Sequence, residues 1–573
     1  MGMVTGQRRV INPRIMITVS RVFVIAMIKN RFGARVSDEQ RSVSVSVPIF
    51  GLYAALGLGL AIYGMSPVLA QVDSVASVAS DDPSSLMASG TPAWRIVPSV
   101  STELTYTDNV RLVRSGKESD LVTRLGPGIL VEGRGGHVTG SFDFRWQQYA
   151  YLNDSQRNNQ QKSLNANGKL ELIDQWLFID GRGSISQQPI SVFGTQDANN
   201  DLANRNRTET STYQWSPYIQ GRLWSAADYT LRYTGSRTKS GEGELSAGSG
   251  NSSRAWSGRL AGETTLSSLS WSVDLQRQQQ DRSTARNTES KRITGSLQYR
   301  IDPQVRLNTT LGRESDNYGS TQSQSRMVRG LGVEWAPTER TNVTLNKEKR
   351  SFGDSYTAAF KHRTALTAWS LSQSRNINTP SDQLLNNGLN SAFELLNLQL
   401  ASTIPDPVAR AQQANLLLQQ AGIPANAQAF GSLVTSRIYI SRRKEASFIL
   451  TGATNIVTLS ADRSDNQSLG TGGVIADDFS LSPNIQQTGF TTSWAHKITP
   501  DTAITLNGRR SRNTGSTANL ETRLNSLSLL LTTKLGPQTS ASVGLRRTHS
   551  GSDSATANGY DEQALTGSLF VTF

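Results

Sequence analysis

The feature that most constrains the fold is an alternation of apolar and polar residues with a period of two, which recurs from Ile96 to the end of the chain. In Arg292–Ile301 the odd-numbered positions are mostly apolar and the even-numbered positions are polar. Gln304–Leu311 repeats the pattern after the short link Asp302-Pro303. Because successive side chains of a strand point to opposite faces, each run predicts a strand with one face suited to hydrocarbon and one suited to water. The same alternation is present in residues 268–279, 326–335, 342–350, 455–461, 503–509 and 540–547.

The links between these strands fall into a short set and a long polar set. The short links are 173–175, 224–228, 336–340, 498–501 and 536–538, and the long links include 188–207, 240–254, 281–290 and 467–483. This segregation is typical of an outer-membrane β-barrel, whose short turns face the periplasm and whose longer loops face outward. A soluble sandwich or solenoid has no reason to segregate its links in this way. The mean hydropathy of −0.39 excludes a helical membrane protein, but a barrel strand needs only every second residue to be apolar.

The last stretch, Gln563–Phe573, predicts the closing strand of such a barrel. Its apolar face includes Leu569, Val571 and Phe573, and the chain stops on that aromatic residue. In Gram-negative bacteria this ending resembles the signal that the barrel-assembly machinery reads during insertion. The alternative is a soluble β-domain that happens to end on Phe.

The links and the alternation together predict the number of strands. We count thirteen strands up to Asn342–Arg350, and two more in Tyr356–Arg363 and Leu366–Ile377. The closing strand must end in the periplasm, so counting back from it places residues 379–433 outside the cell and gives about 22 strands. A miscounted pair would give about 20 or 24. Tryptophans near strand ends or within strands agree with interfacial girdles, at positions 146, 176, 215, 224, 256, 271, 335, 369 and 494.

Residues 379–433 are the one departure from this alternating strand pattern, because their apolar residues have helical spacing. Asp406 is a suitable N-cap with Pro407 at the first helical position, and Gly422 is a suitable C-cap. We expect a helical hairpin that folds into or over the barrel mouth. It would act as a plug or gate, or it would merely pack on the rim, and of these we favour the rim.

Residues 1–70 have the character of an export signal and its leader. An apolar run at 48–65 follows a basic region and precedes small residues, which predicts cleavage between Ala70 and Gln71. The alternative is a membrane anchor. Residues 71–95 are rich in Ser, Ala and Asp and predict a disordered periplasmic lead-in before a barrel at 96–573. The leader holds eight Lys/Arg and two Asp/Glu, so only about +7 of the formal +13 charge remains on the mature chain, and no basic block indicates nucleic-acid binding.

No set of residues predicts catalysis or a cofactor. The four histidines, His137, His362, His496 and His549, have no metal-ligand spacing, and the chain has no cysteine. Asp108 and Asp120 are ordinary turn residues beside a loop. Lys and Arg near the loops suit contact with lipopolysaccharide phosphates or solvation. We therefore expect no enzyme and no bound metal.

Several short motifs resemble the outer-membrane proteins associated with PEP-CTERM/exosortase and exopolysaccharide loci. They occur in matching order over most of the mature chain, at residues 106–110, 119–121, 126–128, 172–180, 183–188, 215–219, 350–353 and 441–443. The resemblance implies an outer-membrane location and a gene that lies in a PEP-CTERM/exosortase or exopolysaccharide locus. It implies no chemical activity, because members of the family are not assigned one.

The resulting hypothesis is a translocation or assembly component of an exopolysaccharide export or PEP-CTERM surface-protein system. Arginines predicted to face the lumen would guide an anionic polymer, namely Arg292, Arg300, Arg306, Arg509 and Arg546. The same residues could instead form ion pairs with lumenal carboxylates. Expected partners are outer-membrane lipid and lipopolysaccharide, the barrel-assembly machinery, and exopolysaccharide with its export proteins. A general diffusion porin and a non-conducting structural or adhesion barrel are the alternatives.

Overall fold

A computed structural model describes residues 94–573 except 199–201, 203, 225, 242–248, 284–285, 380–391, 402–409, 411–413, 415–432, 434, 436, 470–476, 518 and 554–556. The chain divides into two compact units, Met1–Ser89 and Gly90–Phe573, and the described residues belong to the second. The predicted leader, its cleavage site at Ala70 and Gln71, and residues 71–93 lie outside the described residues.

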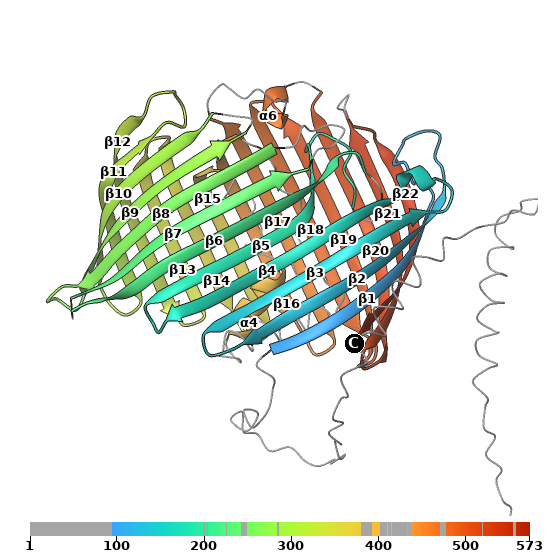
Figure 1. Ribbon diagram of the computed structural model, residues 1–573, viewed down its shortest axis with the longest axis horizontal. Coiled ribbons are helices and arrows are strands. Elements are labelled where there is room, and N and C mark those ends of the chain that lie inside the picture. Colours follow the sequence, from blue (N-terminus) through green and yellow to red (C-terminus); the bar gives the residue numbers. More distant parts are fainter. Residues whose placement is uncertain are drawn as a thin grey trace, which may run out of the picture. The chain divides into compact units, whose positions relative to one another are not determined.

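The described chain forms one 22-stranded antiparallel sheet that closes on itself (Figure 1). Each strand pairs with its sequence neighbours, and β22 returns to pair with β1 from Ser99 opposite Thr572 to Thr107 opposite Ala564. The prediction of an all-β antiparallel barrel of about 22 strands is therefore confirmed. Closure leaves no unpaired strand edge, as a bilayer requires.

The first eleven strands are β1 (Trp94–Thr107), β2 (Asp120–Arg134), β3 (Val138–Tyr151), β4 (Asn159–Ile173), β5 (Leu177–Pro189), β6 (Arg207–Leu223), β7 (Ala227–Ser240), β8 (Ser249–Glu263), β9 (Leu269–Arg282), β10 (Thr288–Arg300) and β11 (Val305–Asp316). The others are β12 (Gln324–Thr338), β13 (Thr341–Arg350), β14 (Gly353–Arg363), β15 (Thr367–Asn378), β16 (Tyr439–Thr451), β17 (Asn455–Ser468), β18 (Asn484–Lys497), β19 (Thr502–Gly515), β20 (Glu521–Gly536), β21 (Thr539–Ser552) and β22 (Tyr560–Thr572). The barrel begins at Trp94, so the expected boundary at residue 96 was two residues late, because Trp94 and Arg95 extend the ladder with β2.

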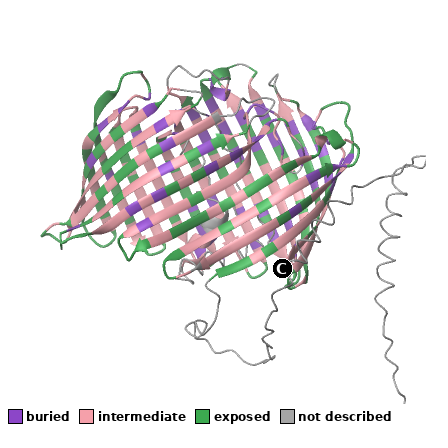
Figure 2. Ribbon diagram, in the orientation of Figure 1, coloured by how far each residue is buried: buried purple, intermediate pink, exposed green. Residues whose placement is uncertain are grey.

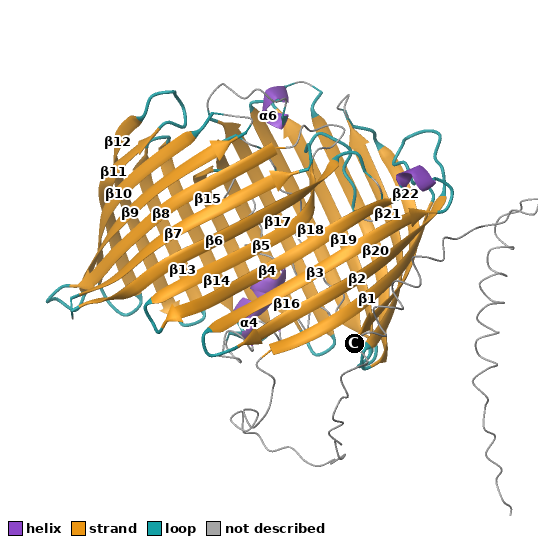
Figure 3. Ribbon diagram, in the orientation of Figure 1, coloured by secondary structure: helices purple, strands orange, loops and turns teal. Residues whose placement is uncertain are grey.

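In the described part of the links, the helices with assigned bounds are η2 (Ser155–Arg157), α4 (Ala392–Leu400) and α6 (Asp478–Leu481) (Figure 3). None of the helices in the described ranges is long and apolar enough to cross a bilayer. Short links join the strands at the end that holds Phe573, which is the periplasmic end by the rule that short turns face the periplasm. The two-residue link 351–352 is a short one at the opposite end, where Gly353 adopts a φ of 104° that a side chain would disfavour.

The outer face of the barrel carries many exposed apolar residues. Figure 2 shows how the degree of burial changes from residue to residue along the strands. In β10, Ile293, Leu297 and Tyr299 are about half exposed, and in β22 Leu565 and Leu569 share the outward face with Phe573. Trp176, Trp224, Trp335, Trp369 and Trp494 are exposed close to the periplasmic turns, as an aromatic girdle requires, whereas Trp215 and Trp256 lie mid-strand and pack on Tyr233. This surface is that of an integral protein of the bacterial outer membrane.

The inner face is polar, and no continuous hydrophobic core fills the barrel. Hydroxyl pairs cross between strands, such as Thr212 with Thr238 and Ser542 with Ser568. Ion pairs such as Arg232 with Asp180 and Arg350 with Glu314 balance inward charges. Many of the buried apolar residues gather in three small clusters where described segments of the links pack on the wall.

Candidate functional site

The extracellular mouth is crossed by the link between β5 and β6, residues 190–206, which we call the mouth loop. Its Val192 carbonyl accepts hydrogen bonds from Asn513 Nδ2 at 3.0 Å and from Thr522 Oγ1 at 2.8 Å. Both donors are buried residues of β19 and β20, on the inward face of those strands. The mouth loop therefore reaches strands far from its own around the ring.

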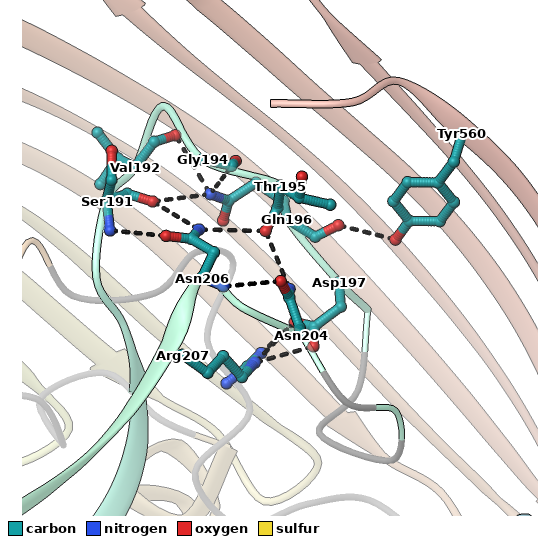
Figure 4. Close-up of polar contacts among 10 residues, drawn as sticks. All are labelled: Ser191, Val192, Gly194, Thr195, Gln196, Asp197, Asn204, Asn206, Arg207 and Tyr560. Atoms are coloured by element: carbon teal, nitrogen blue, oxygen red, sulfur yellow. Dashed lines mark hydrogen bonds and ion pairs between the residues drawn. The ribbon is translucent and has the colours of Figure 1, made fainter. Parts of the chain in front are cut away.

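The mouth loop holds its shape through side-chain amides (Figure 4). Asn206 Oδ1 accepts from Ser191 N at 2.9 Å, and its Nδ2 donates to the carbonyls of Ser191 at 2.8 Å and Thr195 at 3.1 Å. A Cβ at Gly194 would collide with this amide, so the turn needs glycine there. Gln196 Nε2 donates to the Gly194 carbonyl at 2.9 Å. These bonds satisfy backbone groups that a lumenal loop would otherwise leave unpaired.

At its near contact the mouth loop meets α6. Ser191 Oγ donates to Asp478 Oδ1, and Val192 N donates to Asp478 Oδ2 at 2.8 Å. Burial of Asp478, together with the charge of Asp477 beside it, raises the pKa of its carboxyl to about 6, although the two hydrogen bonds act in the opposite direction. Phe193 is fully buried in one apolar cluster with Val192, Leu433, Tyr439, Phe479 and Ile485.

The far part of the mouth loop reaches the seam of the barrel. Tyr560 of β22 donates its hydroxyl to the Gln196 carbonyl at 2.7 Å (Figure 4), and Asn558 N donates to Thr195 Oγ1 at 3.2 Å. Leu202 is buried in a second apolar cluster with Val110, Leu112, Val122, Tyr149, Tyr151 and Tyr560. The mouth loop thus contacts β18–β20 on one side and the β22–β1 seam on the other.

Helix α4, which belongs to the 379–438 link between β15 and β16, lies against the wall at the periplasmic end. Leu396 is fully buried against inward-facing aliphatic residues near the periplasmic ends of four strands, Ala368, Ile449, Ile456 and Ala495, together with Ala414 of the same link. We call these four strand residues the lumenal seat. Gln399 fixes the helix to the wall, since its Oε1 accepts from Thr451 Oγ1 at 2.9 Å and its Nε2 donates to the Ala365 carbonyl at 3.3 Å. Figure 1 shows α4 at the barrel end that carries the C-terminus.

This placement corrects the expectation that the insertion packs on the rim. Helix α4 packs on inward-facing residues at the opposite end of the strands from the one where the link leaves β15 and rejoins β16. Arg410 and Ala414 are also helical, and Arg410 Nε donates to Asn397 Oδ1 at 2.7 Å, which agrees with a helical hairpin. Asp406, Pro407 and Gly422 lie outside the described residues.

The mouth loop and the 379–438 insertion share one anchoring region at the extracellular end. Leu433, on the return segment of the insertion, packs with Val192 and Phe193 of the mouth loop. Thr435 Oγ1 and Arg437 Nε both donate to Asp477, at 2.7 Å to Oδ2 and 3.0 Å to Oδ1. A displacement of the mouth loop therefore disturbs the stem of the insertion directly.

The five predicted lumenal arginines divide into two separate groups. Arg292 pairs with Glu348 at 2.8 Å and Arg306 with Glu334 at 3.4 Å, while Arg300 donates to the Ser267 carbonyl at 2.6 Å. On the other arc Arg546 forms a buried ion pair with Glu562 at 2.8 Å. Arg509 lies in the field of Asp197, Asp462 and Arg207. They form no ring of unpaired charge, so the lumen wall is polar and largely charge-balanced.

The residues that sequence reasoning missed are those of the lumenal seat. A signal was present at Phe448-Ile449-Leu450, where three consecutive apolar residues break the alternation and place an aliphatic side chain inward. Asp108 and Asp120 accept backbone hydrogen bonds from Gln563 and from Leu121 and Asn153, which is structural turn chemistry. No group of three or more His, Cys, Asp and Glu that could hold a metal ion occurs among the residues that the structure describes.

Solved structures with a similar course of the chain include transporters and receptors of other bacteria. The FrpB iron transporter of Neisseria meningitidis in its apoprotein form is 9% identical, with a TM-score of 0.45 over 83% of this chain and 81% of that one. The siderophore receptor PirA of Pseudomonas aeruginosa is 9% identical, with a TM-score of 0.39 over 84% and 81%. PirA of Acinetobacter baumannii is 9% identical, with a TM-score of 0.44 over 83% and 80%. No family model and no curated protein matches the sequence.

The number of strands sets the width of the lumen and so determines whether the barrel needs something inside it to prevent conduction. A barrel of about 22 strands is too wide for its own wall side chains to fill, so it conducts unless something occupies it. Among the described residues, the mouth loop reaches across one end of the lumen and α4 lies against the wall at the other. The mouth loop and α4 are therefore the candidate functional elements, and their contacts with the wall are the candidate site.

Proposed function

We propose that this protein is a gated outer-membrane channel, closed at rest by the mouth loop and α4, which opens to pass a hydrophilic polymer. The observation that carries the proposal is the burial of Leu396 of α4 on the lumenal seat beside the periplasmic turns. The wall, which is mostly polar, carries an aliphatic patch at the place where α4 covers it. Such a patch costs free energy when it is wetted and is repaid only when the helix covers it.

The free energy that holds α4 against the wall is small enough for the helix to act as a gate. For the side chains described in α4, those of residues 396–400, the contacts with the wall include one fully buried leucine, two partly buried leucines and the two hydrogen bonds of Gln399. A buried Leu is worth about 2–3 kcal/mol and a hydrogen bond about 1 kcal/mol. The free energy needed to release α4 is the sum of a few such contacts, which is far less than the free energy needed to unpair a strand. A structural barrel would not need a removable segment.

The wall suits a polymer that is polar along its length. Hydroxyl and amide side chains and paired charges line the described lumen, and they offer hydrogen bonds without a strong field of one sign. This favours a polysaccharide or an extended polypeptide over selection of small anions by the five arginines. The motif resemblance to proteins of PEP-CTERM/exosortase and exopolysaccharide loci supports exopolysaccharide export as the process.

A conductance experiment tests the gate. Because the chain has no cysteine, Gln399→Cys and Thr451→Cys can be joined by a short cleavable bis-thiol cross-linker. We expect low conductance in planar bilayers for the wild type, large openings when residues 380–437 are replaced by a short linker, and no openings in the cross-linked protein until the linker is cleaved. Steady large current from the wild type, unchanged by the cross-link, would establish a diffusion porin instead. Absence of current even without the insertion would establish a non-conducting structural barrel.

A second experiment tests the polymer. A deletion strain should lose surface exopolysaccharide, the wild-type gene should restore it, and the Gln399→Cys/Thr451→Cys protein should restore it only before cross-linking. Each single cysteine variant, treated with the same reagent, is the matched control. Full surface polysaccharide in the deletion strain would rule out the export role while leaving the gate itself to the conductance result.

A further inference from the structure

The outer face of β18–β22 changes character over a short distance toward the extracellular end. The strand register aligns outward-facing residues into rows that run around the barrel. One row is wholly apolar, consisting of Trp494, Leu506, Leu529, Leu545 and Leu565. Because two residues of a strand span about 7 Å, the next two rows lie about 7 and 14 Å above it.

Those two rows carry basic and polar groups. The first contains Thr492, Gly508, Leu527, Arg547 and Gln563, and the second contains Phe490, Arg510, Asn525, His549 and Asp561. All of these residues except Gln563 line a groove of about 490 Å³ on the outer surface. We call it the outer groove. Gly508 leaves the groove hollow beside Thr492, and Phe490 and Leu527 give it an apolar floor.

The basic side chains of the outer groove, Arg510, Arg547 and His549, outnumber its carboxylate Asp561, whose charge also acts on Arg547. No ion pair joins Arg510 or Arg547 to any acidic side chain in the described ranges, and His549 holds Asp561 at 2.7 Å. The row above differs, because Arg512 and Arg523 both bind Glu521. That same row continues around the barrel through Thr488 to Arg463 and Lys444, which face each other across β16 and β17.

This excess of positive charge at the height of the outer leaflet suits an anion from the membrane. Arg463 has a counter-charge of its own, since it pairs with Asp465 at 3.4 Å, whereas the arginines of the outer groove can bind a phosphate in a bidentate manner. The apolar row below marks the hydrocarbon boundary of the outer leaflet, so the anion must be a lipid headgroup whose acyl chains lie along that row. Two arginines on strands β19 and β21 suit a headgroup with two phosphates.

We infer that the outer groove binds the bisphosphorylated glucosamine headgroup of lipopolysaccharide, with Arg510 and Arg547 on its phosphates and acyl chains over Phe490 and Leu527. The inference needs only the barrel in its membrane and is independent of the gate. It names a binding site for the lipid that the basic residues near the loops suggested in general terms. The bound lipid would seal the surface beside the β22–β1 seam.

The test uses the purified full-length barrel in detergent, with bisphosphoryl lipid A as the probe and native mass spectrometry as the readout. Arg510→Gln/Arg547→Gln should weaken lipid A binding at least about tenfold, since each charge-assisted contact is worth more than a neutral hydrogen bond. Arg510→Lys/Arg547→Lys keeps the charge and should retain most of the affinity. Arg259→Gln/Arg306→Gln removes two lumenal arginines and is the control for net charge. Heat-modifiable migration on gels checks that each variant is folded.

Three results would overturn the inference. Equal loss of lipid A binding in the lumenal control would mean that net charge alone attracts the lipid. Equal affinity for phosphatidylglycerol or for dephosphorylated lipid A would remove the headgroup assignment. Competition by millimolar inorganic phosphate as effective as that by lipid A would identify a free-phosphate site. Selective loss in the Gln double variant with retention in the Lys double variant supports it.

Discussion

Truncation of the lumenal seat is expected to open the channel, and the adjacent residue on the same strand supplies the control. Ile449 and Leu450 are neighbours on β16, but Ile449 is fully buried under α4 whereas Leu450 belongs to the outward set of that strand. Ile449→Ala removes apolar contact with the seat cluster. Leu450→Ala removes contact only with lipid, which refills the space.

The magnitude follows from complete burial. Replacing a buried Ile by Ala costs about 2–5 kcal/mol, and this cost falls on the closed state, because in the open state the seat is already uncovered. Each 1.4 kcal/mol changes an equilibrium about tenfold, so the open-to-closed ratio should rise about 30-fold or more. Leu396→Ala, which truncates the other side of the same contact, should give a similar rise, and the two effects should be clearly non-additive.

Single-channel recording gives the open probability of each variant directly. We expect frequent openings for Ile449→Ala and Leu396→Ala and wild-type behaviour for Leu450→Ala. Equal open probabilities for Ile449→Ala and Leu450→Ala would refute the reasoning, because the effect would then arise from the stability of β16 rather than from the seat. Additive effects of the two seat substitutions would also count against a direct contact between them.

Three further predictions concern the mouth loop, a buried ion pair and the chain end. The pKa of the Asp478 carboxyl is raised to about 6 in the folded protein, so its contribution to the attachment of the mouth loop is fully present below about pH 4 and is lost as the pH rises through about 6. Protease cleavage within 190–206 should therefore be faster at pH 7.5 than at pH 5. Asp478→Asn should abolish this difference. Arg546→Gln leaves the buried Glu562 uncompensated and should lower the free energy of unfolding in urea by about 3–5 kcal/mol, whereas Arg306→Gln, at a half-exposed pair, should change it by less than about 1 kcal/mol. Phe573→Ala should lower the heat-modifiable fraction in cells yet leave refolding into detergent micelles unchanged. The reason is that Phe573 is 66% exposed and its backbone N–H still donates to the Pro98 carbonyl. An equal defect in both assays would contradict a role in insertion alone.

The barrel could be predicted from sequence because each strand obeys a local rule. In Arg292–Ile301, two solvents on the two faces impose the period, so the alternation alone gives which residues face lipid. Parity of the strand count then fixed the insertion between β15 and β16 without any knowledge of contacts. The boundary at Trp94 was missed because Trp94 and Arg95 are held by pairing with β2, which is a non-local contact.

The closures could not be predicted because they depend on contacts between segments far apart in the chain. The alternation placed Arg292 in the lumen, but its partner Glu348 lies three strands away, so only the register brings them together. Likewise the seat for Leu396 is assembled from β15, β16, β17 and β18. Helical spacing in residues 379–433 indicated a hairpin, but spacing carries no information about which wall the hairpin meets.

The position of α4 is the central claim, and cross-linking in intact outer membranes tests it most directly. With Gln399→Cys paired to Thr451→Cys at the periplasmic end, a short bis-thiol reagent should link the two sites in most molecules. With Gln399→Cys paired to Ser374→Cys, on the extracellular half of β15, no link should form. The opposite pattern, a link to Ser374→Cys and none to Thr451→Cys, would place the insertion at the extracellular rim and contradict the account.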